Sequence, residues 1–356
     1  MFHVTQRSPE KKVTWNRTWN NLSTIDLHRM ILIDPEVLSC LGCQLPDRPL
    51  HLMSFSNESS SSQLMIIHKA YDDPQKDFFT VQYGNETRAV AKFKMVPFEV
   101  DGRQFLVPED VERFLWSWER SRFIRCLGLD MGRKEKKDFQ EVVAGVARFR
   151  SLAAAHGVTL TLNCGSLLGW YRECSIIPHT SDLDFTINSE EHSANFMRAM
   201  ETSEEFKLSY TLAEPSGCFQ FKACLLGTKT KLDVFYLYKN DSLSWTCGSL
   251  DDFRVVWWYP PTMEFCTGEL LGTLVYVPCA VEEHLEVSRY RLARNRNTLL
   301  DQLWEDLERG SQIQRLRLSK WPFERPSEGK ERRRTSLDDA ICRPLLVKRL
   351  LVGERA

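Results

Sequence analysis

The chain has 356 residues, of which 42% are hydrophobic and 27% are charged, a composition typical of a globular protein with room for about two domains. Its formal net charge of -1 gives no support for a nucleic-acid-binding protein. No stretch approaches the roughly 18 consecutive apolar residues of a membrane-spanning helix, and the N-terminus lacks the pattern of a signal peptide.

Residues 1–107 predict a small β-rich domain, stem-like in character, without visible chemistry. Short runs with strand-like composition cover Leu64–His68, Asp77–Tyr83 and Ala89–Val96, and turn residues separate them. A helix is expected to begin at Pro108, because two acidic residues follow it in the first turn.

Residues 108–285 predict alternating helices and strands, which indicates an α+β domain with a mixed sheet. Apolar residues at helical spacing predict a helix over Lys134–Ala155. A strand over Val158–Leu162 and a helix over Leu167–Glu173 are expected next. The strands expected after them are rich in β-branched and aromatic residues and cover Asp182–Ile187, Phe206–Leu212, Cys218–Cys224, Lys231–Tyr238 and Gly272–Val277.

Three acidic residues fall on or beside these strands. Asp182 and Asp184 are two positions apart, so a strand would present both carboxylates on one face. Two close carboxylates raise each other's pKa unless a cation lies between them. Asp233 interrupts an apolar run, where an unpaired charge is costly. A neighbouring strand carrying Asp233 would complete a three-carboxylate site for Mg²⁺ or Mn²⁺, since hard cations prefer oxygen ligands.

A turn at Gly165 and Ser166 precedes the acid pair and would let backbone amides and a hydroxyl approach a phosphate. A Gly-Ser turn, an acid pair and a lone acid on a later strand form the arrangement of the nucleotidyltransferase fold. The segment Gly165–Phe185 reads GSLLGWYRECSIIPHTSDLDF, and Lys231–Tyr238 reads KLDVFYLY. Together they resemble the fukutin and LicD-type phosphotransferase family.

The resemblance implies transfer of a phospho-alditol from a cytidine diphosphate donor to a glycan hydroxyl. For the fukutin branch it implies CDP-ribitol as donor, ribitol 5-phosphate as the transferred group and a glycan on a glycoprotein such as dystroglycan as acceptor. Asp233 is the candidate base for the acceptor hydroxyl. Arg172 is expected to meet a nucleotide phosphate, with a surface pair to Glu173 as the alternative. His179 is expected to line the site, and Lys231 is interpreted as structural, on the face opposite Asp233.

Two other functions stay open. A metal-dependent glycosyltransferase would also use an Asp-x-Asp pair, although the Gly-Ser turn argues against it. A non-catalytic partner of another glycosylation enzyme is the second alternative, because the resemblance fades beyond Val281. Residues 286–356 predict a divergent basic tail with one amphipathic helix, and the segment after Gly310 is expected to lie outside the catalytic domain.

Five N-glycosylation sequons occur in the chain, more than chance predicts, and they favour a lumenal protein. They begin at Asn16, Asn21, Asn57, Asn85 and Asn240. We therefore expect the Golgi or endoplasmic reticulum lumen, where other glycosyltransferases are possible partners. Members of the family carry an N-terminal membrane anchor, so the chain is expected to begin after such an anchor.

Overall fold

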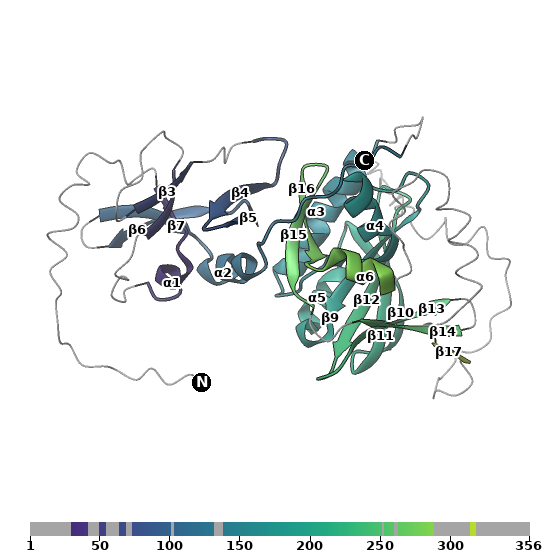
Figure 1. Ribbon diagram of the computed structural model, residues 1–356. Coiled ribbons are helices and arrows are strands. Elements are labelled where there is room, and N and C mark those ends of the chain that lie inside the picture. Colours follow the sequence, from purple (N-terminus) through teal and green to yellow (C-terminus); the bar gives the residue numbers. More distant parts are fainter. Residues whose placement is uncertain are drawn as a thin grey trace, which may run out of the picture. The chain divides into compact units, whose positions relative to one another are not determined.

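The computed structural model describes residues 30–41, 50–54, 64–68, 73–100, 103–131, 138–250, 253–259, 263–287 and 314–317 (Figure 1). The chain forms two compact units, each of which takes two stretches of sequence. We call Met1–Tyr71 with Phe93–Leu115 the N-terminal unit, and Asp72–Lys92 with Trp116–Ala356 the main unit. The mixture of helices and sheets confirms the α+β class. None of the described helices is long and apolar enough to cross a membrane.

The N-terminal unit contains a five-stranded mixed sheet in the order β3-β2-β1-β7-β6. Its elements are β1 (Met30–Leu32), α1 (Pro35–Leu38), β2 (Leu50–Ser54), β3 (Leu64–His68), β6 (Met95–Val100) and β7 (Arg103–Pro108). Leu52 and Met53 are fully buried, which shows that β2 is a core strand of this unit. The bounds predicted for β3 are confirmed, whereas the strand predicted over Ala89–Val96 is wrong, because it joins the end of one strand to the start of another.

A hairpin of β4 (Phe78–Tyr83) and β5 (Glu86–Ala91) belongs to the main unit, although the sequence placed it within the β-rich N-terminal domain. Two hydrogen bonds of Asp77, one through its amide and one through its carboxylate, explain the difference. The Asp77 amide donates to the carbonyl of Gly272 over 3.2 Å. The Leu274 amide donates to Asp77 Oδ1 over 2.8 Å. Asp77, which directly precedes β4, therefore hydrogen-bonds to β16, almost two hundred residues further along the chain.

The main unit is built on a ten-stranded mixed sheet. Its central order is β15-β16-β8-β9-β12-β13-β14-β17, and β11 pairs with both β12 and β10. The strands are β8 (Thr161–Leu162), β9 (Asp182–Asn188), β10 (Phe206–Glu214), β11 (Gly217–Leu225), β12 (Lys231–Lys239), β13 (Ser244–Leu250), β14 (Phe253–Tyr259), β15 (Phe265–Leu270), β16 (Thr273–Pro278) and β17 (Gln314–Arg317). β12 runs parallel to β9 and antiparallel to β11, so it lies between the two strands that matter most for the site.

Helices pack on this sheet through apolar side chains. Besides α1 and α2 (Val111–Glu119), of which α2 is divided between the two units, the described helices are α3 (Gln140–Ala154), α4 (Cys164–Glu173), α5 (Ala194–Glu201) and α6 (Val281–Val287), with one 3-10 turn, η4 (Ser189–Glu191). Phe149 of α3 is fully buried and contacts the rings of Phe185 and Phe206, with centroids 5.5 Å and 5.2 Å away. Such aromatic contacts fix α3 against β9 and β10 and hold β9 in place.

Part of the predicted basic tail joins the sheet. β17 pairs antiparallel with β14, with Arg317 opposite Phe253. Residues 314–317 therefore belong to the main sheet, contrary to the expectation that everything after Gly310 lies outside it. The amphipathic helix predicted near Leu299–Leu307 lies outside the described residues.

Candidate active site

The three predicted acids meet where β9 and β12 run side by side. In the parallel register Asp184 lies opposite Asp233, and Asp182 lies opposite Lys231. Residues opposite each other in neighbouring strands share a face, and so do residues two apart in one strand. All three carboxylates therefore stand on the same face of the sheet. Lys231 stands there as well, so the expectation that it points to the opposite face is wrong.

Asp184 is tied to the start of α4. Its amide donates to Ser166 Oγ over 2.8 Å, and the Asn163 amide donates to the Asp184 carbonyl over 3.0 Å. The Gly165 amide donates to the carboxyl group. Cys164, the first residue of α4, has a left-handed backbone with φ of 43°, an unfavourable conformation for a residue with a side chain. This sharp turn leads into the Gly165 amide and thus brings the helix N-terminus against the carboxylate.

The pKa of Asp184 is raised from 3.8 to about 8. Burial is the largest cause, because it removes water from the charged form, and repulsion from Asp182 and Asp233 adds to it. The Gly165 amide and the Lys222 ammonium act in the opposite direction. In the absence of a bound metal ion, a pKa of about 8 keeps most of this carboxyl group protonated at neutral pH.

Lys222 of β11 is a member of the site that the sequence reasoning missed. It lies opposite Asp233 in the antiparallel register, and its Nζ contacts Asp233 Oδ2 at 2.7 Å. Burial raises the pKa of Asp233, which is 7% exposed, and Lys222 counteracts part of that rise. The available signal was a lone lysine in the alternating run Cys218–Cys224, next to the strand that carries Asp233.

The carboxylates are suited to a hard divalent cation, although they do not form a closed ligand cluster. In the described part of the chain no three Asp, Glu, His or Cys side chains are grouped so as to hold a metal ion. Asp233 Oδ1 is buried and has no hydrogen-bond partner among the described residues. An unpartnered carboxylate oxygen beside a second acid with a raised pKa is the environment that a cation would relieve. Asp184 and Asp233 thus offer oxygen ligands of the kind that Mg²⁺ or Mn²⁺ prefers, and the metal site itself stays a prediction.

The remaining predicted site residues lie in different surroundings. His179 is exposed in the turn before β9. Thr180 donates to Asp182 Oδ1 over 2.8 Å and thereby orients that carboxylate. Arg172 is only 4% exposed and donates through Nε and Nη2 to Glu173 Oε1. The Glu173 pair that was the alternative for Arg172 is present, but it is buried rather than on the surface.

The predicted turn at Gly165 and Ser166 is wrong, because both residues belong to the first turn of α4. A second feature absent from the sequence reasoning is a buried polar contact beside this first turn. Nε2 of His284, on α6, lies 2.8 Å from Asn163 Oδ1. The His284 ring stacks on Tyr259 with centroids 4.4 Å apart. Burial lowers the pKa of His284 to about 3, so the imidazole is neutral. The separation of 121 residues between Asn163 and His284 explains why no local sequence pattern pointed to this contact.

A known protein family matches the part of the chain that contains the candidate site. Residues 157–280 match the profile described as LicD/FKTN/FKRP, nucleotidyltransferase domain. The matched stretch contains the acids, Gly165, Ser166 and Lys222.

Relatives extend the similarity beyond that domain. An uncharacterized protein of Caenorhabditis elegans is 30% identical over 277 residues, which is 72% of this chain and 70% of that protein. Mouse ribitol-5-phosphate transferase FKTN is 29% identical and its human counterpart 27% identical, each over 266 residues. These matches cover 69% of this chain but 56% of either transferase, so the chain spans little more than half of their length. With its acids and its relatives in agreement, the chain belongs to the LicD/FKTN/FKRP family.

Proposed function

We propose that this protein is a metal-dependent phosphotransferase that moves ribitol 5-phosphate from a CDP-linked donor to a glycan hydroxyl in protein O-glycosylation. One observation carries the proposal: Asp182, Asp184 and Asp233 share one face of the sheet beside the N-terminus of α4. Such a site suits a reaction at a diphosphate, whose charge must be neutralised as the nucleotide leaves. Ribitol 5-phosphate is proposed as the transferred group because the FKTN relatives are named ribitol-5-phosphate transferases.

The three carboxylates would hold Mg²⁺ or Mn²⁺, which when bound neutralises phosphate charge and orients the donor. Groups of the protein itself would bind the phosphate and accept the proton. The N-terminus of α4 presents its positive end to an anion, and Gly165 carries no side chain that would hinder the approach of a phosphate. Asp233, with its raised pKa, is the candidate to accept the proton of the acceptor hydroxyl.

Arg172 and His179, the other two predicted contacts of the donor, differ in how accessible they are. The Arg172 guanidinium is engaged by Glu173, so a contact with a phosphate requires that pair to open. His179 is exposed three positions before Asp182, and its contact with a bound donor is part of the proposal.

A non-catalytic role as a partner of another glycosylation enzyme is the second candidate. It is favoured by the pairing of Lys222 with Asp233 in place of a closed ligand cluster among the described residues. In that case the lysine would substitute permanently for the cation, and the protein would keep the fold without the reaction.

We also propose that the protein works in the lumen of the Golgi or endoplasmic reticulum, on a glycan of a dystroglycan-like glycoprotein. Among the described residues, disulfides join Cys126 to Cys174, Cys218 to Cys247 and Cys266 to Cys279, and such bonds persist in oxidising compartments. The sequon residues Asn85 and Asn240 are both exposed, as acceptance of a glycan requires.

Donor cleavage and transfer test the proposal. The protein, expressed in the secretory pathway of eukaryotic cells, is incubated with CDP-ribitol, CDP-choline or a UDP-sugar, each with Mn²⁺ or with a chelator. We expect release of CMP from CDP-ribitol that requires Mn²⁺, and transfer to a glycopeptide acceptor. Cleavage of the UDP-sugar alone would support a glycosyltransferase, and no cleavage of any donor would support the non-catalytic role.

A further inference from the structure

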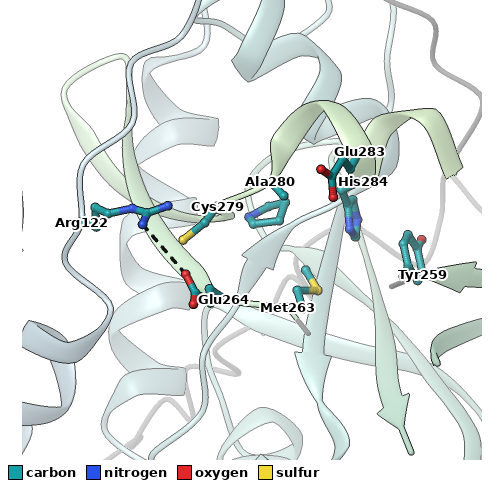
Figure 2. Close-up of a pocket in the computed structure, with 9 residues that line it drawn as sticks. Arg122, Tyr259, Met263, Glu264, Cys279, Ala280, Glu283 and His284 are labelled. Carbon is teal, nitrogen blue, oxygen red and sulfur yellow. Dashed lines mark ion pairs between the residues drawn. The ribbon is translucent and has the colours of Figure 1, made fainter. Parts of the chain in front are cut away.

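A cavity of about 250 Å³ lies beside α6 in the main unit (Figure 2). None of the three acids Asp182, Asp184 and Asp233, which we call the carboxylate row, lines it. Its lining includes Tyr259 at the end of β14, Glu264 just before β15, and Glu283 and His284 on α6. Arg122 also lines it and pairs with Glu264 over 3.9 Å. Because ligand sites for larger compounds are usually about 300–1,000 Å³, this cavity has the size for a single small ring or a short polyol.

The wall of the cavity is covalently fixed. Cys279, which lines it, forms a disulfide with Cys266 of β15. The Cys279 amide also donates to the Glu264 carbonyl over 2.9 Å. A pre-formed wall reduces the conformational entropy that a ligand must overcome on binding.

His284 gives the cavity a defined hydrogen-bonding character. Its Nε2 faces Asn163 Oδ1, which can only accept, so Nε2 carries the proton of the neutral ring. Nδ1 is then an acceptor, and the structure gives it no partner among the described residues. Met263, Pro278 and Ala280 also line the cavity and give it apolar surface.

The charges at the cavity select against phosphate. Glu264 and Glu283 contribute two carboxylates, and the guanidinium of Arg122 is already paired with one of them. An anion would therefore meet net repulsion. A neutral group with several O–H donors and one C–H face would match the carboxylates, the imidazole of His284 and the apolar lining together.

We propose that this cavity binds a neutral carbohydrate group, either a single sugar ring or an alditol. Asn163 connects it to the active site, because its side chain contacts His284 and its amide donates to the Asp184 carbonyl. Asn163 does not line the cavity itself, but its two contacts link His284, which does, to the backbone of Asp184. Binding of a sugar does not depend on the proposed transfer reaction; only the assignment of that sugar to donor or acceptor rests on it.

Direct binding in the absence of metal and nucleotide tests the inference. Saturation-transfer NMR and calorimetry are carried out with ribitol and ribose as donor-side probes, methyl mannoside as an acceptor-side probe, and inorganic phosphate. We expect saturable binding of at least one carbohydrate. The side of the reaction from which the tightest probe comes identifies the source, and none of these measurements requires turnover.

Glu283→Gln removes one carboxylate at an exposed position while keeping the size of the side chain. We expect it to weaken the carbohydrate affinity about tenfold, as for loss of a hydrogen bond to a charged group. Glu286→Gln, on the same helix and outside the cavity lining, is the matched control and should bind like the native protein.

Three results would overturn the inference: no saturable binding of any carbohydrate, tighter binding of phosphate than of every carbohydrate, or equal affinity in Glu283→Gln and Glu286→Gln. Carbohydrate binding that persists while CDP-ribitol is never cleaved would count against the proposed transferase activity alone.

Discussion

Asp184 and His284 reach the start of α4 from different parts of the main unit, one from β9 and the other from α6. Burial shifts both towards the neutral form, raising the pKa of Asp184 to about 8 and lowering that of His284 to about 3. Their neighbours differ, however. Asp184 faces two further acids, whereas burial is the cause of the His284 shift, and its ring is held by Asn163 and Tyr259.

The protonation of Asp184 can change under mild conditions, whereas that of His284 cannot. A cation or a moderate change of pH can convert Asp184 to its charged form, because its neighbours already repel that charge and a cation would relieve the repulsion. His284 would need strong acid to become charged. The three carboxylates are therefore the part of the site whose protonation a metal ion would change, whereas the imidazole of His284 stays neutral and keeps its contact with Asn163.

Removal of the Asp184 carboxylate should give the largest effect. We expect Asp184→Asn to reduce transfer from CDP-ribitol by about a hundredfold or more, because a first ligand of the cation is lost. Calorimetry with Mn²⁺ should show a parallel loss of affinity. Asp241→Asn, at an exposed position in the turn after β12, is the matched control and should behave like the native protein. Unchanged Mn²⁺ affinity in Asp184→Asn would remove this residue from the metal site.

The pH dependence of stability should sharpen the comparison next. In metal-free protein, folded Asp184 keeps its proton after the unfolded chain has lost it, so the free energy of unfolding should fall as pH rises from 3.8 to about 8. For His284 the sign is reversed: its stabilising contribution is complete above 6.5 and is lost as pH falls towards about 3.

Urea unfolding across this pH range separates the two contributions. Asp184→Asn should flatten the alkaline decline and leave the acid decline unchanged, because Asn resembles the protonated acid in shape and cannot ionise. Equal profiles for the variant and the native protein above pH 5 would show that Asp184 has an ordinary pKa.

Loss of the lysine should have a smaller effect. Lys222→Met leaves the buried Asp233 without its cationic partner, and we expect the free energy of unfolding to fall by about 1–2 kcal/mol in metal-free protein. Saturating Mn²⁺ should recover more stability in this variant than in the native protein, since the metal would take over the role of the ammonium. Lys207→Met, at an exposed position of β10, is the control. No difference between the two variants would mean that the Lys222 pair contributes little.

The acids and their common face could be predicted from sequence because the information is local. A spacing of two in a strand sets the face of Asp182 and Asp184, and the apolar run around Asp233 marks a buried strand. The same rule also places Lys231 beside Asp233, and its face was predicted wrongly only because the spacing was misapplied. The nearly correct bounds of β10, β11 and β12 follow from their regular composition.

Lys222 and the contact between Asn163 and His284 required the tertiary structure. Lys222 reaches Asp233 only because β11 pairs with β12 in one particular register. His284 meets Asn163 only because α6 packs near α4. The hairpin of β4 and β5 was assigned to the wrong region for the same reason, since the hydrogen bonds of Asp77 join it to residues far along the chain.

The three disulfides with both partners described follow one another along the chain without overlap. Cys126–Cys174, Cys218–Cys247 and Cys266–Cys279 close loops of 48, 29 and 13 residues. Each loop is complete before the next begins, so a chain entering an oxidising compartment from its N-terminal end can form these bonds one at a time, in order of synthesis. The loops also become shorter towards the C-terminus, and shorter loops close at lower entropic cost. The last one, which fixes the wall of the cavity, is thus the easiest to form and depends least on the rest of the chain having folded.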